Sequence, residues 1–323
     1  MAFRIGVIGA GSHGTRYLRH AARDVPGMTA TALCRRNQEA GQKLAAELSC
    51  RYHREPGDLI EDPQVDGVVI CTPPSSHAEL AEATLRAGKP LLLEKPMTGT
   101  LAEARRLAAL ATVPGAPPLM VAQTLRWNPV LTRVKELWPR LGQVHLVRLA
   151  QRLEPTTLAW QRDLAQTVGG SVLLTGVHIF DLARYLTGAE FAEVDSRQAC
   201  IQNPVVEDIF LARARLDDGC WASLEVSKYT RSRAAWVEAV GEKGQIFADY
   251  LTGGIILREG LEEEDFDVSA RAPTLPPVLR DWLAAVSQGG PVPVTALDGL
   301  ATMEVVDACY RSHDQGRAVT MGA

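Results

Sequence analysis

Short apolar runs alternate with helical patterns of hydrophobic residues over positions 3–122 of the sequence. The apolar runs are three to six residues long, whereas the segments between them place apolar residues three and four positions apart. Val68-Val69-Ile70 shows no polar alternation, which is typical of a strand buried on both faces of a parallel sheet. The pattern predicts βαβ units with strands at 3–8, 29–34, 66–71, 91–93 and 119–122 and helices at 76–87 and 101–111.

Two of these helix starts have the spacing of a capping box. Ser76 is followed by Glu79 and Thr100 by Glu103, so that each pair can satisfy free backbone N–H groups reciprocally. We therefore expect helices to begin at both positions.

The pattern changes after about residue 123 to that of an α+β region. Asn128-Pro129 combines a capping residue with proline at the first turn, which predicts a helix leading to Trp138. Asp217-Asp218-Gly219 joins two strand-like runs, 205–216 and 220–227, and predicts a hairpin. The second run alternates apolar and more polar residues, so one face of an antiparallel sheet is expected to pack inward and the other to be exposed or to form a subunit interface.

Composition narrows the class of protein. The 323 residues have a formal net charge of −4, which gives no reason to expect nucleic acid or an anionic membrane as a partner. No apolar run is long enough to cross a bilayer, and the N-terminus runs directly into a strand. The six cysteines have neither disulfide-rich nor zinc-binding spacing, so no metal site is expected and a cytoplasmic location fits best.

A glycine-rich loop follows the first strand. Gly9, Gly11 and Gly14 form the pattern G-x-G-x-x-G between a strand and a helix, in which the first glycine allows a tight turn, the second a close approach of a pyrophosphate and the third helix packing. The free N–H groups and dipole of the helix N-terminus, at Ser12 and His13, favour an anion there. The loop predicts a dinucleotide cofactor.

Arginine stands at the end of the second strand, where an acidic residue usually binds the ribose hydroxyls of NAD. Arg35 and Arg36 suit a 2′-phosphate, and no carboxylate is present to repel it. We therefore predict a preference for NADP(H) over NAD(H), the alternative being an exposed arginine pair.

Two loops follow the carboxyl ends of later strands, where ligands bind in parallel sheets. They contain Thr72-Pro73-Pro74 and Glu94-Lys95-Pro96. Lys95 can donate to a substrate oxygen, stabilise alkoxide charge or relay a proton, and Glu94 can hold it in place. Lys95 is the first candidate for a catalytic residue, although a lysine after a strand is otherwise a solvated loop residue.

These motifs together resemble the Gfo/Idh/MocA family of glucose-fructose oxidoreductase, inositol dehydrogenase and rhizopine-catabolism proteins. The likeness rests on the glycine loop, on Cys71 to His77, on Gly88-Lys89-Pro90 and Glu94-Lys95-Pro96, and it continues through Arg126 to Pro129, residues 169–188 and Asp298-Gly299-Leu300. The resemblance implies a Rossmann domain at residues 1–123 and an α+β domain with an open, mostly antiparallel sheet at 124–323. It also implies an NAD(P)-dependent oxidoreductase of sugars or polyols that forms a homodimer or homotetramer. The expected cofactor contacts include Thr72, Pro73 and His77 and, in the next loop, Glu94 and Lys95.

The resemblance also identifies His178 as the catalytic histidine. In the standard form an aspartate lies four residues earlier, on the same helix face, but this chain has Leu174 there. Thr175 points about 100° around a helix from that position and cannot simply substitute. Asp181 is equally consistent with substrate contact and with pairing to an arginine such as Arg184, and a histidine on such a helix can also be a buried structural residue.

The resemblance places substrate contacts at Arg126, Trp127 and Arg162, although surface packing accounts for each nearly as well. The leading hypothesis is an NADP(H)-dependent oxidoreductase acting on a secondary alcohol or ketone through Lys95 and His178. The alternative is a cofactor-binding sensor without turnover, for which Leu174 is the argument. A non-redox enzyme that uses a tightly bound nicotinamide transiently is a third possibility.

Overall fold

The computed structural model describes residues 2–269 and 272–322, which form two compact units. One unit comprises residues up to 123 together with 274–300, and the other comprises 124–273 together with the residues from 301 onward. Each unit is built around one β-sheet.

The first unit has a six-stranded sheet in the order β3-β2-β1-β4-β5-β6, and every pairing in it is parallel. This is the strand order of a dinucleotide-binding Rossmann fold, in which the order reverses between β1 and β4. The α/β class expected from the sequence is therefore confirmed. The strands are β1 (Phe3–Ile8), β2 (Met28–Cys34), β3 (Arg51–His53), β4 (Gly67–Ile70), β5 (Leu91–Glu94) and β6 (Leu119–Ala122).

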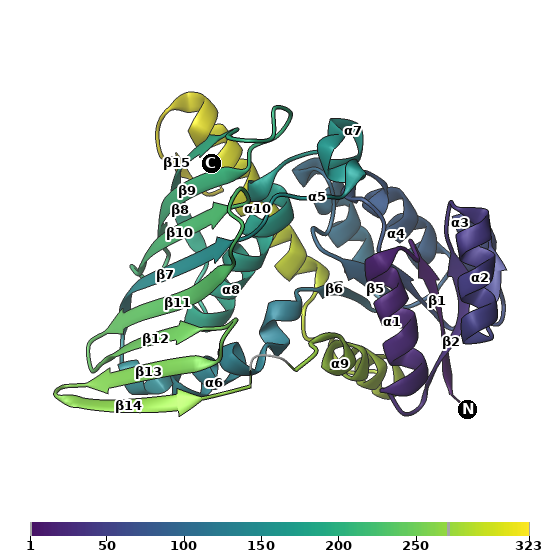
Figure 1. Cartoon of the computed structure of the whole chain (residues 1–323), viewed down its shortest axis with the longest axis horizontal. Helices are drawn as coiled ribbons and strands as arrows, with labels where there is room; N and C mark the ends of the chain where they lie inside the picture. Colours follow the sequence, from purple (N-terminus) through teal and green to yellow (C-terminus); the bar gives the residue numbers. More distant parts are fainter. Residues whose placement is uncertain (1, 270–271, 323) are drawn as a thin grey trace. The chain divides into compact units, whose positions relative to one another are not determined.

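The helices of this unit flank the sheet (Figure 1), and they are α1 (Ser12–Arg23), α2 (Gln38–Leu48), α3 (Pro56–Glu61), α4 (His77–Arg86) and α5 (Leu101–Ala111). The capping box at Thr100 is confirmed, since its side chain accepts from the Glu103 N–H while Glu103 accepts from the Thr100 N–H. The one predicted at Ser76 is wrong, because the Ser76 hydroxyl instead donates to Thr72 Oγ1 and the Pro73 carbonyl.

A segment from the C-terminal part of the chain also packs in the first unit. Helix α9 (Leu275–Gln288) buries Trp282 completely, with its ring 5.5 Å from that of Phe3, and Val121 N–H donates to the Val294 carbonyl. The sequence prediction placed this segment in the second domain. The difference arises because α9 buries its apolar face, including Trp282, against β1. The local sequence pattern does not show on which sheet such a helix packs.

The second unit has a nine-stranded sheet in the order β14-β13-β12-β11-β7-β10-β9-β8-β15. All pairings are antiparallel except that of β10 with β7, so the expected mostly antiparallel sheet is confirmed. The strands are β7 (Val144–Arg152), β8 (Phe191–Ala199), β9 (Ile209–Leu216), β10 (Trp221–Ser227), β11 (Ala234–Gly241), β12 (Gln245–Asp249), β13 (Gly254–Glu259), β14 (Glu262–Asp267) and β15 (Val319–Thr320).

The predicted hairpin joins β9 and β10, and Gly219 takes the left-handed conformation (φ +89°) that the turn requires. Strand β9 begins at Ile209 rather than at 205, because residues 201–208 form a loop held by the Asp208 carboxylate. On β10, Ala222 and Leu224 are buried and Trp221 is half exposed, as the alternation predicts.

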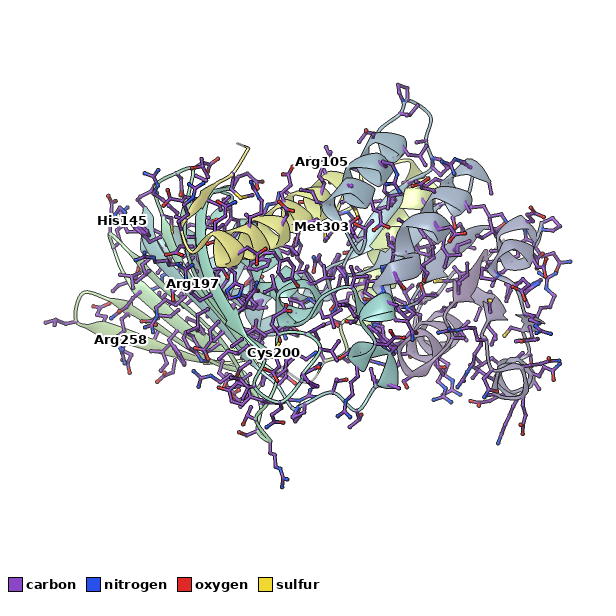
Figure 2. The ribbon with its side chains drawn as sticks, turned by 90° about the horizontal axis from the view of Figure 1, so that it is seen from above. Arg105, His145, Arg197, Cys200, Arg258 and Met303 are labelled. Carbon is purple, nitrogen blue, oxygen red and sulfur yellow. The ribbon has the colours of Figure 1, made fainter. Side chains whose placement is uncertain are left out.

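Helices cover one face of this sheet (Figure 1). Helix α6 begins after Asn128, whose side chain accepts from the Val130 and Leu131 N–H groups as expected, and α6 and α8 pack against the sheet. Figure 2 shows Arg197, His145 and Arg258 on strands of this sheet and Cys200 in the loop that follows β8. The helices are α6 (Pro129–Leu137), α7 (Leu164–Thr167), α8 (Val177–Thr187) and α10 (Ala296–Gln315), the last of which begins in the first unit.

Within the described part of the chain, no helix combines the length and apolar character needed to cross a membrane.

Candidate active site

The glycine loop lies between β1 and α1, and each glycine meets a different steric demand. Gly9 has φ +87°, and a Cβ there would lie 2.6 Å from the Cys71 carbonyl oxygen. A Cβ at Gly14 would lie 2.4 Å from the Gly9 carbonyl oxygen, whereas one at Gly11 would meet nothing within 4 Å. Gly9 and Gly14 are thus fixed by backbone approach, and Gly11 faces open space.

The N-terminus of α1 is suited to a phosphate group. Its N-cap residue Gly11 has no side chain to cap the helix, so the first N–H groups, at Ser12, His13 and Gly14, have no side-chain acceptor from the cap. Ser12 and His13 are exposed. Together with the open space at Gly11, this arrangement fits the pyrophosphate of a dinucleotide.

The predicted ribose-binding position lies directly after β2. The Cys34 carbonyl accepts from the Gly9 N–H at 3.0 Å, which brings the end of β2 beside the glycine loop. Arg35 follows and is half-buried, Arg36 is exposed, and the Arg35 carbonyl accepts from the Tyr52 hydroxyl at 3.1 Å. No described acidic side chain forms an ion pair with the Arg35 guanidinium.

His77 connects the two loops that follow β4 and β5. Its Nδ1 lies 2.7 Å from the Pro96 carbonyl oxygen and its Nε2 lies 2.8 Å from the Thr72 carbonyl oxygen. His77 is 1% exposed, so it supports the loops, whereas the sequence prediction gave it a direct cofactor contact. Thr72 and Pro73 are partly exposed, and Thr72 Oγ1 accepts from the Ser76 hydroxyl.

The Glu94 carboxylate, at the carboxyl end of β5, joins the glycine loop to the lysine loop. Its Oε1 lies 2.6 Å from His13 Nε2 and accepts from the Tyr17 hydroxyl at 2.8 Å, and its Oε2 accepts from the Lys95 N–H at 3.1 Å. Burial alone would raise the pKa of Glu94, but the hydrogen bond to His13 and the charges of His13 and Lys95 hold it at about 2. Glu94 is therefore an anion, and its position is fixed from both sides.

Lys95 stands next to this anion, and the Lys95-Pro96 peptide bond is cis. Burial lowers the pKa of the Lys95 ammonium, and the neighbouring Glu94 carboxylate opposes that shift without cancelling it. A lysine with a lowered pKa gives up a proton more readily and can serve in general acid/base catalysis. Glu94 is 6% exposed and accepts from the Lys95 N–H, so its carboxylate holds this loop.

The histidine segment in the second unit is helical but not a regular α-helix. Residues Val172–Gly176 form a π-helical segment that continues into α8. From residue 169 to 183 every side chain is buried except His178, which keeps partial exposure. Leu174 is 7% exposed and Thr175 is 4% exposed. A π-helical turn is often found at functional sites, and here it precedes the only accessible residue of the segment.

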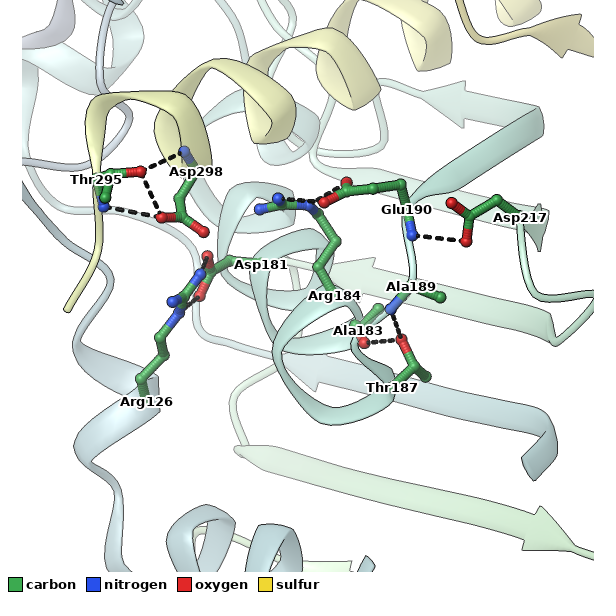
Figure 3. A network of polar contacts seen from close by, with 10 residues as sticks. All are labelled: Arg126, Asp181, Ala183, Arg184, Thr187, Ala189, Glu190, Asp217, Thr295 and Asp298. Carbon is green, nitrogen blue, oxygen red and sulfur yellow. Dashed lines mark hydrogen bonds and ion pairs between the residues drawn. The ribbon is translucent and has the colours of Figure 1, made fainter. Parts of the chain in front are cut away.

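Two predicted substrate residues, Arg126 and Asp181, bind each other (Figure 3). Arg126 Nε and Nη2 donate to the Asp181 carboxylate at 2.9 and 2.6 Å, and Asp181 is 1% exposed. The arginine pairing that was the alternative for Asp181 is therefore present with Arg126, and Arg184 forms an ion pair with Glu190. This bidentate pair joins the start of the unit to α8.

The remaining predicted substrate residues lie on short helical turns. Trp127 is half-buried next to Arg126, and Arg162 is exposed and donates to the Thr156 carbonyl at 3.3 Å. Among residues 2–269 and 272–322, no group of three or more His, Cys, Asp or Glu side chains could hold a metal ion.

Three residues that form buried side-chain hydrogen bonds were not identified from the sequence pattern. Tyr17 binds Glu94, and its place on the buried face of α1, three residues after Gly14, was the available signal. Glu207 and Tyr310 bind each other in the second unit, with the Tyr310 hydroxyl 2.8 Å from Glu207 Oε1. Nothing in the local pattern relates two positions 103 residues apart.

Comparison with known proteins covers nearly the whole chain. Residues 3–122 match the family model described as "Oxidoreductase family, NAD-binding Rossmann fold", and residues 139–321 match "Oxidoreductase family, C-terminal alpha/beta domain". Both belong to the Gfo/Idh/MocA models.

Individual relatives agree in length and fold. Inositol 2-dehydrogenase 1 of Saccharopolyspora erythraea is 27% identical over 99% of this chain and 96% of its own. D-apiose dehydrogenase of Paraburkholderia graminis is 29% identical over 99% of this chain and 90% of its own. The crystal structure of GenD2 from gentamicin A biosynthesis, in complex with NAD, superposes with a TM-score of 0.88 at 27% identity, covering 100% of this chain and 97% of GenD2.

Proposed function

Because this chain belongs to the Gfo/Idh/MocA family of oxidoreductases, we propose that it transfers a hydride between a nicotinamide cofactor and a C–OH carbon of a sugar or polyol. The observation that carries this proposal is the cluster of Glu94, His13 and Lys95. It fixes a lysine with a lowered pKa at the carboxyl edge of a parallel sheet, beside a glycine loop suited to a dinucleotide. The nicotinamide supplies the hydride chemistry when it is bound.

Lys95 has the role of binding and polarising the reacting oxygen. Its ammonium donates to the substrate hydroxyl or carbonyl, stabilises the alkoxide charge and exchanges a proton with it. Its lowered pKa supports the proton exchange, and the Glu94 carboxylate, bound to the Lys95 N–H, supports the placement.

His178 has the role of a second hydrogen-bonding group on the substrate. Its partial exposure in an otherwise buried helical segment supports this role. Leu174, one turn earlier, provides no carboxylate, so proton exchange rests on Lys95 and His178. Family membership favours this enzyme over the sensor alternative.

The cofactor preference we propose is for NADP(H). Arg35 supports it, since its guanidinium follows β2 beside the glycine loop without an acidic partner. Calorimetric titration of the nucleotide-free protein with NADPH and NADH measures the preference. We expect NADPH to bind at least about tenfold tighter, and Arg35→Ser to remove that difference.

The matched control for that titration is Arg23→Ser, which removes an exposed arginine at the other end of α1. It should leave both affinities unchanged. Equal binding of NADH and NADPH by the wild type would reject the preference and leave the oxidoreductase proposal intact.

Turnover itself is tested by the near-ultraviolet absorbance of reduced nicotinamide, with NADP⁺ or NAD⁺ and a panel of inositols, aldoses, polyols and sugar acids. Substrate-dependent absorbance and a primary isotope effect from deuterium at the reacting carbon are expected. A protein that binds cofactor but reduces none of it with any member of the panel would contradict the proposal and favour the sensor.

We also propose self-association as a homodimer or homotetramer and a cytoplasmic location. The exposed face of the nine-stranded sheet supports association, since it presents Trp221, Leu211 and Phe247 among cross-strand ion pairs. Free cysteines support the reducing location. Light scattering measures the assembly, and a monomer at micromolar concentration would reject it.

A further inference from the structure

The helical segment that carries His178 begins at a pair of glycines, and two residues from other parts of the second unit lie against them. A Cβ at Gly169 would lie 2.4 Å from the Tyr310 hydroxyl oxygen, and one at Gly170 would lie 2.1 Å from the Glu207 carbonyl oxygen. Both distances are too short for a Cβ atom, which essentially never comes within 3.0 Å of such a neighbour. The glycine pair therefore leaves room for Tyr310 and Glu207 to lie against the main chain at this point.

Glu207 satisfies three consecutive main-chain N–H groups at the start of this segment. Its Oε1 accepts from the Gly170 and Val172 N–H groups at 3.1 and 3.0 Å, and its main-chain carbonyl accepts from the Ser171 N–H at 2.8 Å. The first N–H groups of a helix have no partner within the helix, and Ser171, at the N-cap, offers them no side-chain hydrogen bond. A residue that lies far along the chain thus caps this helix.

Glu207 is itself held in place from two directions. Its Oε1 also accepts from the hydroxyl of Tyr310, on α10, at 2.8 Å. The next residue, Asp208, is 5% exposed, and its carboxylate accepts from three main-chain N–H groups of the same loop at 2.6 to 2.8 Å. This loop follows β8, where Figure 2 labels Cys200. Glu207 is therefore a fixed acceptor.

The position of His178 depends on where the helical segment begins. Residues Val172–Gly176 form its π-helical part, and π-helical turns are rare and short in proteins. His178 lies six residues after Val172, which corresponds to about 9 Å along a helix. A change of one residue in the register of the first turn would rotate the following side chains by about 100°. Because Glu207 fixes that turn, it also determines the direction of the His178 side chain.

The opposite end of the same helix is held in a comparable way. Lys135 Nζ, on α6, donates to the Tyr185 and Leu186 carbonyls at 2.7 and 3.0 Å, so a cation lies at the end of α8 where the helix dipole is negative. Both carbonyls lie about two helical turns beyond His178. Lys135 thus supports the helix without touching the turn that leads to His178, and it offers a matched comparison for Glu207.

We propose that Glu207 is the positioning residue of His178: it caps the first turn of the helical segment and thereby sets the direction of the imidazole. It acts as a hydrogen-bond acceptor, so the amide oxygen of glutamine can replace its carboxylate, whereas a side chain without an acceptor cannot. The part of His178 in the reaction rests on the proposed function, whereas its position is measured without turnover.

The first experiment compares kcat among variants of the full chain. Glu207→Ala should lower kcat by at least about twentyfold, since a displacement of about 1 Å in a reacting group can cause such a loss, while the calorimetric affinity for reduced cofactor should change by less than about twofold. Glu207→Gln keeps the acceptor and should stay within about threefold of the wild type. Lys135→Met, which removes the cap at the other end of the helix, is the control and should keep kcat within about twofold.

A double-mutant cycle separates positioning from a general loss of structure. If Glu207 acts through His178, Glu207→Ala should change kcat by less than about threefold in a protein that already contains His178→Ala. An equal loss in both backgrounds would overturn the inference, as would a loss in Glu207→Gln or Lys135→Met as large as that in Glu207→Ala.

The position of His178 is measured without substrate by nitrogen-15 NMR of labelled histidine side chains, in which His178→Ala identifies the signal. We expect Glu207→Ala to shift the His178 signal, and Glu207→Gln and Lys135→Met to leave it in place. An unchanged signal in folded Glu207→Ala would overturn the inference. A shifted signal in a protein that shows no turnover would reject the proposed function and support the positioning role.

Circular dichroism shows whether Glu207→Ala is folded. If it is not, Glu207→Asp takes its place, because its carboxylate is one methylene shorter and cannot reach both N–H groups from the same main-chain position. The same shift of the His178 signal is expected in Glu207→Asp, and its absence would overturn the inference.

Discussion

Two partly or fully buried glutamates, one in each unit, have pKa values shifted in opposite directions. Glu94 in the first unit is held at about 2, whereas burial raises the pKa of Glu207 in the second unit above its ordinary value. Each carboxylate accepts a tyrosine hydroxyl and at least one main-chain N–H. The hydrogen bonds are therefore similar, and the difference lies in the charged neighbours.

Glu94 has a histidine and a lysine beside it, and Glu207 has only neutral donors. Neutral donors reduce the cost of burying the Glu207 carboxylate but do not reverse the effect of burial on its pKa, whereas the His13 hydrogen bond and the nearby charges do so for Glu94. The first site therefore holds a carboxylate with a lowered pKa next to a lysine with a lowered pKa. The second uses a carboxylate as a structural acceptor.

The largest expected effect comes from removing the lysine of the first site. Lys95→Ala should lower kcat by about a thousandfold, because it removes the group that donates to the developing alkoxide. Binding of the reduced cofactor should change by less than about threefold, as measured by calorimetry, and Lys43→Ala, an exposed lysine of α2, should retain full activity. Wild-type kcat in Lys95→Ala would exclude a catalytic role.

Glu94→Gln should destabilise the protein by about 3 kcal/mol at neutral pH, because the hydrogen bonds and charges that favour the buried Glu94 carboxylate are lost. In the wild type the lowered pKa contributes stability that is complete above the ordinary value of 4.5 and is lost as pH falls toward about 2. Urea unfolding across that window should show a steeper loss in the wild type than in Glu94→Gln.

The control for this series is Glu79→Gln, an exposed glutamate on α4, which should follow the wild type within about 0.5 kcal/mol. An acid profile of Glu94→Gln identical to that of the wild type would mean that ionisation of Glu94 does not contribute to stability in this window.

Removing the neutral donor of the second site should have a smaller effect. Tyr310→Phe leaves Glu207 with its two main-chain donors, so we expect a loss of about 1 kcal/mol in urea unfolding and a further rise in the pKa of Glu207. A loss as large as that of Glu94→Gln would show that the two sites do not differ as described.

Glu207→Gln should have the smallest effect and the opposite dependence on pH. A raised folded pKa contributes stability that is complete below 4.5 and is lost as pH rises through the folded value. Glutamine does not ionise, so the variant should lie within about 1 kcal/mol of the wild type and gain relative to it with rising pH. Urea unfolding at acid and neutral pH measures this, and a relative loss with rising pH would contradict the raised pKa.

The parts of the molecule that could be predicted from the sequence are those whose residues follow local rules. In the first unit, residues Leu101–Ala111 and Leu119–Ala122 lie where the apolar pattern predicted, since each element satisfies its own local rules. His13, Glu94 and Lys95 were each identified because they lie in short motifs, although their contacts join positions up to 81 residues apart. Local motifs thus identified the members of this cluster without the bonds between them.

The second unit was less predictable because its contacts join segments without a motif. Glu207 and Tyr310 lie in a loop and a helix whose local patterns indicate nothing about each other, and the π-helical segment changes the phase that a regular helix would give to Leu174 and Thr175. The failed capping box at Ser76 has a similar cause, since Thr72 and Pro73 compete for the hydroxyl.

His77 contacts two loops of the first unit but can donate a hydrogen bond to only one of them. Both of its ring nitrogens face carbonyl oxygens, which only accept, while burial lowers its pKa and favours the neutral ring. A neutral imidazole has one N–H. His77 therefore donates either to the Thr72 carbonyl in the loop after β4 or to the Pro96 carbonyl in the loop after β5. The tautomer of His77 therefore determines which of the two loops receives its hydrogen bond.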